Sequence, residues 1–300
     1  MATTNASPLQ PFEQLGLIGC GLMGGSFALA LKKAGLVKRV VGYSKSPTTT
    51  ELASRLGVID VAAPSALLAA AGADLILVAV PVAATGATLK SIKNLITPET
   101  LVMDVGSTKA DVVQAARSSL REQMGSFVPA HPIAGKEVAG VEHSDANLYR
   151  GAQVILTPVE RTLTRHLQKA RQLWEALGCH VQAMSPEEHD ATLATVSHLP
   201  HLLAFAMMQS ILDQPQPDKV LSMAGPGFRD FTRIAAGDPK LWRDVLLANK
   251  QQVLLQARYF QQALHQLELL MAADDGQGLE DRLALASAAR AQWKPGKALE

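Results

Sequence analysis

The chain has 300 residues, enough for two domains of ordinary size. Apolar residues make up 48% of it and charged residues 18%, and no uncharged apolar run reaches the ~18 residues that a membrane span requires. The 28 Lys and Arg residues against 27 Asp and Glu leave a formal net charge of +1, which excludes the basic field of a nucleic-acid-binding protein. We therefore expect a soluble protein that acts on small molecules, with neither nucleic acid nor a membrane as partner.

The cysteines and the N-terminal residues bear on the cellular compartment. Cys20 and Cys179 are the only two cysteines, too few for a disulfide framework or a four-ligand zinc site, which favours a reducing environment. Residues 1–11 are rich in Thr, Ser, Ala and Pro and lack the charged and apolar regions of a secretory signal. We expect residues 1–11 to be a disordered lead-in and the protein to be cytoplasmic.

Short apolar runs alternate with longer amphipathic stretches from Leu15 onward, a pattern typical of βαβ units and a parallel sheet. Strands are predicted at 15–18, 37–43, 74–80 and 100–104, and helices at 24–34, 48–56, 82–95 and 108–120. Two further apolar runs, 127–130 and 153–156, are predicted to extend this sheet, and a helix at 161–177 follows. The pattern predicts an α/β domain with a Rossmann-type, doubly wound sheet over residues 12–184.

The patterning becomes purely helical at Ser185-Pro186-Glu187-Glu188, which has the Ser cap, the first-turn Pro and the Glu of a capping box. Helices are predicted at about 186–212, 218–224, 238–273 and 278–293. The third of these is unusually long, and its apolar residues continue on more than one face. We expect residues 185–300 to form an all-α domain whose helices build a homodimer; a helix that packs between the domains of a monomer is the alternative.

The first predicted strand leads directly into Gly19-Cys20-Gly21-Leu22-Met23-Gly24 and then into a helix. In this context the glycines match the dinucleotide-binding fingerprint: Gly19 makes the tight turn, Gly21 admits a pyrophosphate, and Gly24 permits close helix-to-strand packing. A merely tight strand-to-helix turn is the alternative. The residues expected to contact the cofactor are Gly19, Gly21, Leu22, Met23 and Gly24, together with Val80 and Pro81 at the end of the third predicted strand.

The end of the second predicted strand bears on which dinucleotide is bound. NAD sites normally carry an Asp or Glu there for the ribose 2′-hydroxyl, but Ser44 and Lys45 stand twenty and twenty-one residues after Gly24. A hydroxyl and an ammonium group would suit a 2′-phosphate, so we expect NADP to be preferred over NAD. A solvated Lys45 and acceptance of both cofactors is the alternative.

Two polar segments, 104–109 and 130–137, lie at or beyond the ends of later strands, where doubly wound sheets bind their ligands. An enzyme that oxidises an alcohol needs a base for the hydroxyl proton, and His131, of a residue type with a reference pKa of about 6.5, suits that task. Ser107 could hydrogen-bond either the imidazole or the substrate. A loop histidine that pins a turn beside Pro132 is the alternative.

Five ordered motifs between about Leu15 and about Ala263 resemble those of the prephenate and arogenate dehydrogenases of tyrosine biosynthesis. They are Gly19-x-Gly21-x-x-Gly24, Val105-Gly106-Ser107-Thr108-Lys109, the segment from His131 to Gly140, Ser197-His198-Leu199-Pro200-His201, and the segment from Gly227 to Ala235 followed by Trp242-Arg243-Asp244. In that family a cyclohexadienol gives a hydride to the nicotinamide, and the ring carboxylate leaves as carbon dioxide. The resemblance implies oxidative decarboxylation of prephenate to 4-hydroxyphenylpyruvate, or of arogenate to tyrosine.

The resemblance also implies roles for individual residues. His131 would take the proton of the substrate's 4-hydroxyl, and Ser107 would be the hydrogen-bonded partner of His131. Arg233 would bind a substrate carboxylate, which a guanidinium can hold bidentately. Glu137 would pair with Arg233 and gate the site.

His198 and His201 lie three residues apart and would share one face of a helix. Such a pair could bind a metal ion, but no Cys or carboxylate stands at a ligand spacing and the reaction needs no Lewis acid, so we expect none. By resemblance, one or both histidines contact the substrate. Arg229, four residues before Arg233, is interpreted either as a second substrate-binding arginine or as a surface side chain.

Two other functions are compatible with the architecture. A β-hydroxyacid-type NADP-dependent dehydrogenase would carry a catalytic lysine on the first helix of the second domain, and residues 191–209 contain none. A non-catalytic NADP-sensing module would have no reason to keep His131, Ser107 and Arg233 together. The resemblance therefore favours an enzyme.

Overall fold

The computed structural model describes residues 9–294, so most of the expected lead-in, residues 1–8, lies outside the described residues. Six parallel strands form the main sheet in the order β3-β2-β1-β4-β5-β6, the doubly wound arrangement predicted from the sequence. The strands are β1 (Phe12–Ile18), β2 (Val37–Tyr43), β3 (Val61–Ala62), β4 (Leu75–Val78), β5 (Leu101–Asp104) and β6 (Phe127–Val128). β1 begins three residues before its predicted start, and Asp74 accepts hydrogen bonds from the backbone of Glu13 and Gln14 there.

Each strand supplies side chains to two separate cores, because successive residues point to opposite faces of a sheet. In β4, Leu75 and Leu77 belong to one core, and Ile76 and Val78 to the other. The first core includes α1 (Leu22–Lys33) and α6 (Thr164–Ala176); the second includes α3 (Ala66–Ala70), α4 (Thr85–Ile92) and α5 (Ala110–Leu120). α2 (Pro47–Arg55) packs beside β3 at the outer end of the sheet and adds Ala53 to the first core. Burial on both faces explains the continuous apolar runs of the strands.

A second, smaller sheet corrects one expectation. β8 (Gln153–Leu156) does not extend the main sheet but pairs antiparallel with β7 (Ala130–Ile133) and parallel with β9 (His180–Ala183). The predicted strand 127–130 divides at Pro129, which has no N–H to donate, and the N–H of Ala130 donates to the Asp104 carboxylate instead of to a strand. The chain therefore leaves the main sheet just before His131, and β7 carries this histidine.

The helical region begins as predicted, with the Ser185 hydroxyl accepting a hydrogen bond from Glu188 N at 3.1 Å. From there α7 (Pro186–Leu193), a π-helical turn (Ala194–His198) and α8 (Leu199–Leu212) run on as one rod. The remaining helices are α9 (Pro217–Leu221), α10 (Pro226–Thr232), α11 (Pro239–Ala248), α12 (Lys250–Ala272) and α13 (Gly276–Gln292). Within residues 186–294 the structure contains no strand, in agreement with the sequence pattern.

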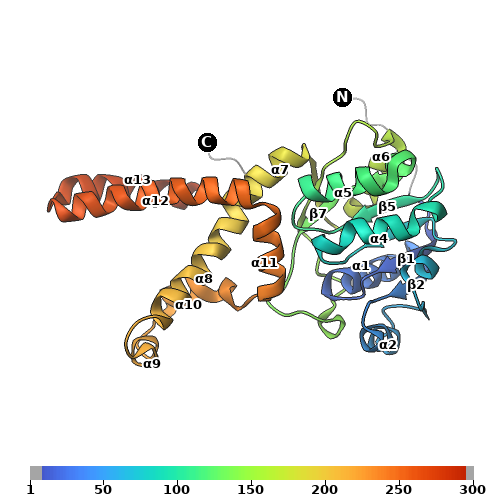
Figure 1. Cartoon of the computed structure of the whole chain (residues 1–300), viewed down its shortest axis with the longest axis horizontal. Helices are drawn as coiled ribbons and strands as arrows, with labels where there is room; N and C mark the ends of the chain where they lie inside the picture. The colour runs from blue at the N-terminus through green and yellow to red at the C-terminus, as the bar shows by residue number, and fades with distance from the viewer. Residues whose placement is uncertain (1–8, 295–300) are drawn as a thin grey trace.

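The prediction of a single long helix over 238–273 is wrong, because the helix is interrupted at Asn249, between α11 and α12. Asn249 has φ −105° and ψ 26°, and its buried amide donates to Asp190 O at 2.7 Å and lies 3.1 Å from His198 Nδ1. The two helices consequently run in different directions from this residue (Figure 1). The polar partners of Asn249 lie far away in the sequence, so the helical periodicity gave no sign of the break.

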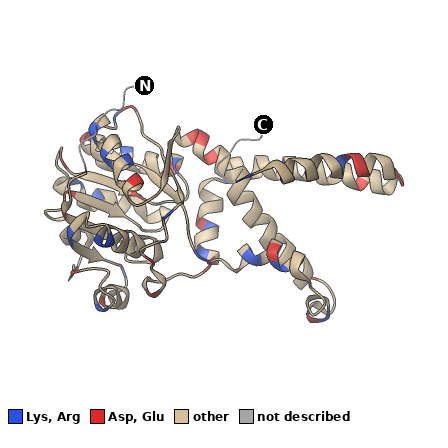
Figure 2. Ribbon diagram, turned by 180° about the vertical axis from the view of Figure 1, so that it is seen from behind, with Lys and Arg blue, Asp and Glu red and all other residues tan. Residues whose placement is uncertain are grey.

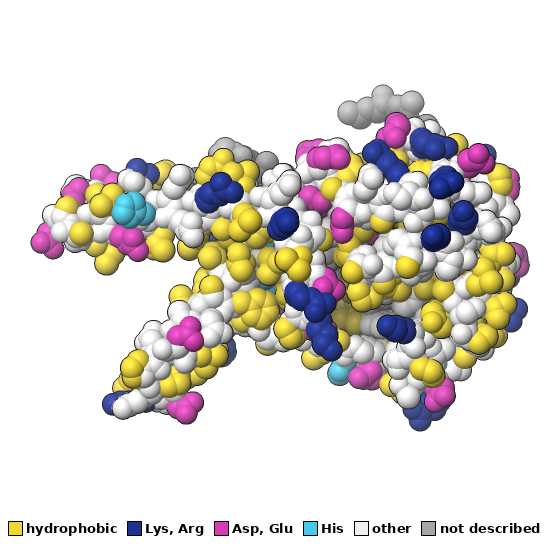
Figure 3. Space-filling model, in the orientation of Figure 1, with side chains coloured by type: hydrophobic (Ala, Val, Ile, Leu, Met, Phe, Trp, Pro, Cys, Tyr) yellow, Lys and Arg dark blue, Asp and Glu magenta, His cyan; other side chains and the backbone are white. Residues whose placement is uncertain are grey.

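Two helical arms project from the body of the molecule (Figure 1). α12 and α13 form one arm and α8 with α9 and α10 forms the other, and Figure 2 shows long stretches of both without charged side chains. Large apolar side chains are exposed along them, among them Met207, Leu212, Leu254, Tyr259, Phe260, Leu264, Leu269, Leu283 and Leu285. Figure 3 shows the same apolar character on the arms and on the surface where they meet.

The run 186–212 is also long and apolar enough to cross a membrane, judged by length and composition alone, which the sequence analysis did not expect. Buried helices of soluble proteins pass the same test. This run contains His189, Asp190 and His198, which are buried against other elements of the fold. It therefore forms part of the site described next.

Candidate active site

The glycine-rich turn between β1 and α1 has the geometry of a phosphate cradle. A Cβ at Gly19, which has φ +102°, would collide with Ala79 O, and one at Gly24 would collide with Gly19 O. At Gly21, by contrast, no atom lies within 4 Å of the position of a Cβ. The turn is thus tightly packed at Gly19 and Gly24 and open at Gly21. The opening lies at the N-terminus of α1, where backbone N–H groups attract anions. These residues fit a dinucleotide pyrophosphate.

The remaining cofactor candidates surround this turn. Leu22 is buried, and Met23 is fixed through its carbonyl oxygen, which accepts a hydrogen bond from Tyr149 Oη at 2.7 Å. Val80 and Pro81 follow β4 immediately after Ala79, whose carbonyl oxygen abuts Gly19. The structure thus brings the third predicted strand's end next to the glycine turn.

Ser44 and Lys45 lie just after β2, but they differ in their environments. Ser44 Oγ accepts a hydrogen bond from Cys20 N at 2.8 Å and so ties the glycine turn to the end of β2. Burial raises the pKa of the Cys20 thiol to about 11, and the hydrogen bond to Ser44 opposes this effect. The thiol therefore stays protonated and serves to pack the turn. Lys45 is exposed. The Ser44 hydroxyl therefore already has partners within the turn, the backbone N–H and the thiol of Cys20.

A buried ion pair holds the ends of β5 and β7 together. Lys109 Nζ lies 2.5 Å from Asp104 Oδ2 and donates to Ala130 O at 2.8 Å, while Asp104 Oδ1 accepts from Ala130 N at 3.0 Å. Both side chains are almost fully buried. The pair therefore fixes the backbone immediately before His131 and places a positive charge nearby.

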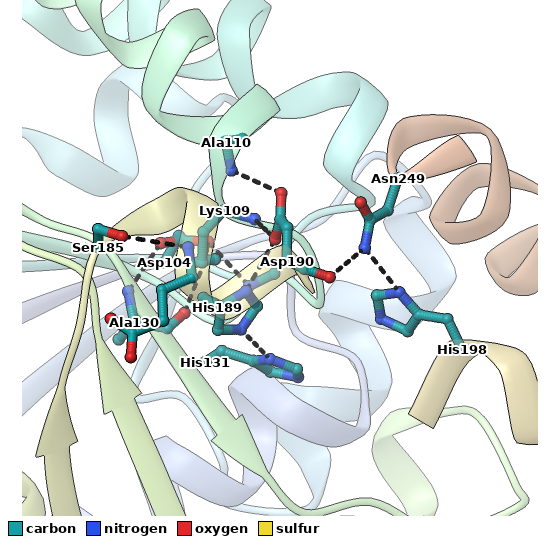
Figure 4. A network of polar contacts seen from close by, with 12 residues as sticks. Asp104, Lys109, Ala110, Ala130, His131, Ser185, His189, Asp190, His198 and Asn249 are labelled. Atoms are coloured by element: carbon teal, nitrogen blue, oxygen red, sulfur yellow. Dashed lines mark hydrogen bonds and ion pairs between the residues drawn. The ribbon is translucent and has the colours of Figure 1, made fainter. Parts of the chain in front are cut away.

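His131 is linked to two residues that the sequence analysis did not select (Figure 4). His131 Nδ1 lies 2.8 Å from His189 Nε2, and His189 Nδ1 lies 2.8 Å from Asp190 Oδ1. The Asp190 carboxylate also accepts from the backbone N–H groups of Lys109 and Ala110 at 2.8 and 2.9 Å. β7, α7 and the start of α5 thus meet in one polar cluster, which is buried at the junction of the sheet and the helices.

The electrostatics of this cluster favour a neutral His131. Burial lowers the pKa of His131 well below its ordinary value, and the neighbouring His189, Lys109 and His198 act in the same direction. Burial raises the pKa of Asp190, but hydrogen bonds from His189, Ala110 N and Lys109 N outweigh that effect, so its pKa is lower than usual. The cluster consequently holds an ionised Asp190 and a His131 that can accept a proton at neutral pH.

Ser107 is not the hydrogen-bonded partner of His131 in this structure. Its side chain makes no hydrogen bond within residues 9–294, and His189 occupies Nδ1 of His131 instead. Ser107 is half-buried after β5, and its backbone is near His198, whose pKa it influences. The only sequence signal for His189 was a His-Asp pair in the first turns of α7, which is too common a pattern to single out.

His198 and His201 both pack against Trp242 on α11. The His201 ring stacks on the indole with 3.5 Å between centroids, and His198 meets it edge-on at 6.3 Å. Burial is the main reason why the pKa of His198 falls to about 4. Because Asn249 Nδ2 donates to Nδ1, the neutral ring carries its proton on Nε2, and this buried atom has no partner among the described residues. His198 thus offers one free donor.

Arg233 follows α10 in a 3₁₀ turn, and Glu137 lies in the loop after β7. The two side chains form an ion pair, as the resemblance implied, and both remain about half exposed. Arg233 also lies close enough to His201 to contribute to lowering the pKa of that histidine, after the larger effect of burial. Arg229 is 74% exposed and pairs with its neighbour Asp230 at 3.2 Å, which matches the surface alternative.

The candidate residues therefore gather where the carboxyl ends of the strands meet the helices, and the surface is hollowed between the body and α11 (Figure 3). Among residues 9–294, no group of three His, Cys, Asp or Glu side chains is arranged to hold a metal ion.

Comparison with known proteins decides the family. The model for the nucleotide-binding domain of prephenate dehydrogenase matches residues 27–183, and the model for the dimerization domain of the same enzyme matches residues 185–285. The chain belongs to the prephenate dehydrogenase family. Both domains of that family are thus represented, in the order that the sequence analysis expected.

Individual relatives agree with this assignment. A cyclohexadienyl dehydrogenase of Zymomonas mobilis is 32% identical over 94% of this chain and 97% of its own length. A prephenate dehydrogenase of Bacillus subtilis is 38% identical over 79% of this chain, which spans 64% of that relative's length. The crystal structure of an Aquifex aeolicus prephenate dehydrogenase with hydroxyphenyl propionate and NAD⁺ has a TM-score of 0.87 and 35% identity, covering 93% and 97% of the two chains. The expected family, fold and oxidoreductase class are confirmed.

Proposed function

We propose that the chain catalyses the oxidative decarboxylation of prephenate to 4-hydroxyphenylpyruvate, or of arogenate to tyrosine, with NADP preferred over NAD. The observation that carries this proposal is a buried His131, held by His189, between the glycine turn and the helices that bear His198, His201 and Arg233. Membership of the prephenate dehydrogenase family supports the same reaction.

The residues present fit a dinucleotide. Backbone N–H groups at Gly21, Leu22 and Met23 would hold the pyrophosphate over the open side of the turn, with Val80 and Pro81 beside it. Ser44 and Lys45 would meet the 2′-phosphate of NADP. The nicotinamide, when bound, would supply the acceptor for the substrate's hydride.

His131 would take the proton of the substrate's 4-hydroxyl on Nε2, because its Nδ1 is occupied by His189. Ser107, close to His198 and without a hydrogen bond of its own in the structure, would bind the substrate rather than orient the imidazole. The free Nε2–H of His198 would donate to a substrate oxygen, with His201 beside it. When carbon dioxide leaves, the electron pair of the broken C–C bond enters the ring and makes it aromatic, which drives the reaction forward.

Arg233 would hold the substrate carboxylate that stays on the molecule. Its current partner, Glu137, is an exposed carboxylate, so an incoming substrate carboxylate could replace it at little cost. This exchange would let the Arg233–Glu137 pair open when substrate enters. Arg229, exposed and paired with Asp230, would contribute less to binding.

The exposed apolar side chains of α8, α12 and α13 support a homodimer formed through these helices. The family model that matches this region is that of a dimerization domain. We also expect the protein to be cytoplasmic, since both cysteines are unpaired and buried.

Initial rates of nicotinamide reduction for four pairings, prephenate or arogenate with NADP or NAD, test the proposed function. We expect turnover with at least one of the two substrates and a higher kcat/KM with NADP. A strong preference for NAD would overturn the role assigned to Ser44 and Lys45. Binding of nucleotide with no turnover in any pairing would instead indicate a sensing module or a different hydroxyacid substrate.

A further inference from the structure

The partner of His131 Nδ1 is the imidazole of His189, which can take up a proton, whereas a hydroxyl such as that of Ser107 could only orient the ring. We propose that His189 and Asp190 form a proton relay behind His131: they fix its tautomer and hold, during turnover, the proton that His131 displaces. This inference rests on the proposed function, since it concerns the proton of the substrate's 4-hydroxyl. His189 and Asp190 are positioning residues in this account, because neither touches the substrate.

The direction of the relay follows from its anchored end. Asp190 accepts hydrogen bonds from Lys109 N, Ala110 N and His189 Nδ1, and three N–H donors keep a carboxylate ionised. His189 must therefore carry a proton on Nδ1, and a neutral His189 has its lone pair on Nε2. His189 and Asp190 lie on α7, and the two backbone donors lie at the start of α5.

The tautomer of His131 follows in turn. His189 Nε2 lies 2.8 Å from His131 Nδ1, so His131 donates its Nδ1 proton to His189 and has its lone pair on Nε2. That is the form in which His131 can accept a proton from a hydroxyl. With the opposite tautomer, Nε2 of His131 would carry the proton, and the lone pairs of His131 Nδ1 and His189 Nε2 would face each other between the rings.

The proton balance of the reaction gives the relay its task. As the hydride leaves the carbinol carbon for the cofactor, the electron pair of the substrate's O–H bond becomes a carbonyl bond, and its proton forms a bond to His131 Nε2. The Nδ1 proton of His131 then moves to His189 Nε2, so the positive charge lies beside Asp190. When carbon dioxide leaves, the electron pair of the broken C–C bond shifts through the ring to the oxygen. The oxygen recovers a proton from His131 Nε2, and both histidines return to their starting forms.

The surroundings of His131 explain why a relay is useful. Lys109 from the start of α5, His198 from the π-helical turn and His189 from α7 present positive or potentially positive groups to it, and burial opposes its charging further. Asp190 supplies a negative charge next to His189, whereas the Asp104 carboxylate, which accepts from Ala130 N, is already paired with Lys109. Transfer of the proton to His189 would move the positive charge away from the groups around His131 and place it beside the Asp190 carboxylate.

The relay makes a specific prediction for acid pH. A proton taken up from solvent by the coupled pair would put an N–H on His189 Nε2 that donates to His131 Nδ1. His131 would switch its own proton to Nε2 and could no longer accept one from the substrate. The fall in kcat/KM on the acid side therefore reports protonation of the two histidines as a unit.

The variant His189→Gln separates the relay from simple orientation. A Gln amide oxygen can accept from His131 Nδ1 and preserve its tautomer, but it cannot take up a proton. We expect kcat with the substrate that wild type turns over to fall about 10- to 100-fold, less than the ~10²- to 10⁴-fold assigned to a direct acid–base group. KM and nucleotide affinity should stay within about twofold, because the substrate contacts are unchanged. The acid limb, meaning the fall in kcat/KM on the acid side of the pH profile, should move to lower pH. In this variant His131 titrates alone, in a site that disfavours its charged form.

The matched control is His166→Gln. His166 is also a buried histidine, and its Nε2 lies 2.8 Å from Pro98 O in another part of the domain. The His166→Gln variant should leave kcat and the acid limb unchanged. A wild-type kcat in His189→Gln, or an acid limb that does not move, would overturn the relay.

A measurement on the unaltered enzyme keeps the inference testable if His189→Gln does not fold. In protein labelled with ¹⁵N-histidine, the resonances of His131 and His189 should both show a proton on Nδ1 at neutral pH. A proton on Nε2 of His131 would contradict the relay. This result does not depend on turnover, and inactive wild-type protein in the four-pairing assay would count against the proposed function alone.

Discussion

The candidate site is built around one histidine whose chemistry is set by residues distant in the sequence. His131 and Ser107 could be found from the sequence because they lie in compact motifs after predicted strands. His189 lies 58 residues from His131, and Asn249 lies 51 residues from its partner His198. Periodicity and spacing describe local structure, so neither contact could be predicted from the pattern. For the same reason the sequence pairs Ser107 with His131, whereas in the structure His189 contacts His131.

The two arginines provide a test at the scale of single residues. Arg233→Ala should raise KM about tenfold or more with little change in kcat, since a charged hydrogen bond contributes about 1.5–3 kcal/mol. Arg229→Ala should change KM less than about threefold, because an exposed ion pair contributes only about 0–1 kcal/mol. Steady-state kinetics on both variants would measure this difference. Equal effects on KM would show that both guanidinium groups bind the substrate.

At the scale of elements, the sequence predicts the sheet well and its periphery less well. The strands buried on both faces gave clear apolar runs, and the cap at Ser185 marked the start of the helices. β3, with two residues, and the largely exposed β9 were too short or too polar to predict. Pro129 and Asn249 redirected the chain through a missing donor and a buried amide, respectively, and each moved a site residue into place.

The buried pair between β5 and the start of α5 gives a prediction about stability. Lys109→Met would leave the Asp104 carboxylate buried without its partner, which should lower the free energy of unfolding by about 3–5 kcal/mol. Lys32→Met, which breaks the more exposed pair with Asp60, should cost no more than about 1 kcal/mol. Urea denaturation at one protein concentration would compare the two. A similar loss in both variants would mean that the buried pair does not hold β5 and β7 together.

At the scale of the whole molecule, the two helical arms are the feature that the sequence indicated only indirectly. The apolar residues on several faces of α12 suggested a partner, and the structure leaves many of them exposed. The bend at Asn249 turns α12 away from the body, so these faces lie on a projecting arm (Figure 1). Periodicity can show that a helix has excess apolar surface, but the direction of the helix depends on its tertiary contacts.

Stability of the whole molecule should also depend on pH. The pKa of His198 is about 4 in the folded protein, against a reference value of 6.5, so below pH 6.5 the unfolded chain binds the proton more readily. The contribution of His198 to the free energy of unfolding is present above pH 6.5 and is lost as the pH falls toward 4. About 2 kcal/mol of it is lost by pH 5. His131 acts in the same direction.

Urea denaturation between pH 7 and pH 5 would measure this dependence. His198→Gln should make the fall in the free energy of unfolding shallower, while His265→Gln, at an exposed histidine, should leave the slope unchanged. An unaltered slope in His198→Gln would show that His198 titrates alike in the folded and unfolded states.

The central claim is that His131 serves an oxidation coupled to decarboxylation. The most direct test counts carbon dioxide released against nicotinamide reduced when wild-type protein turns over prephenate or arogenate, beside His131→Ala as the matched variant. We predict one carbon dioxide for each reduced nicotinamide, and a loss of about 10²- to 10⁴-fold in kcat for His131→Ala with nucleotide affinity unchanged. Nicotinamide reduction without carbon dioxide, or full activity in His131→Ala, would contradict the account.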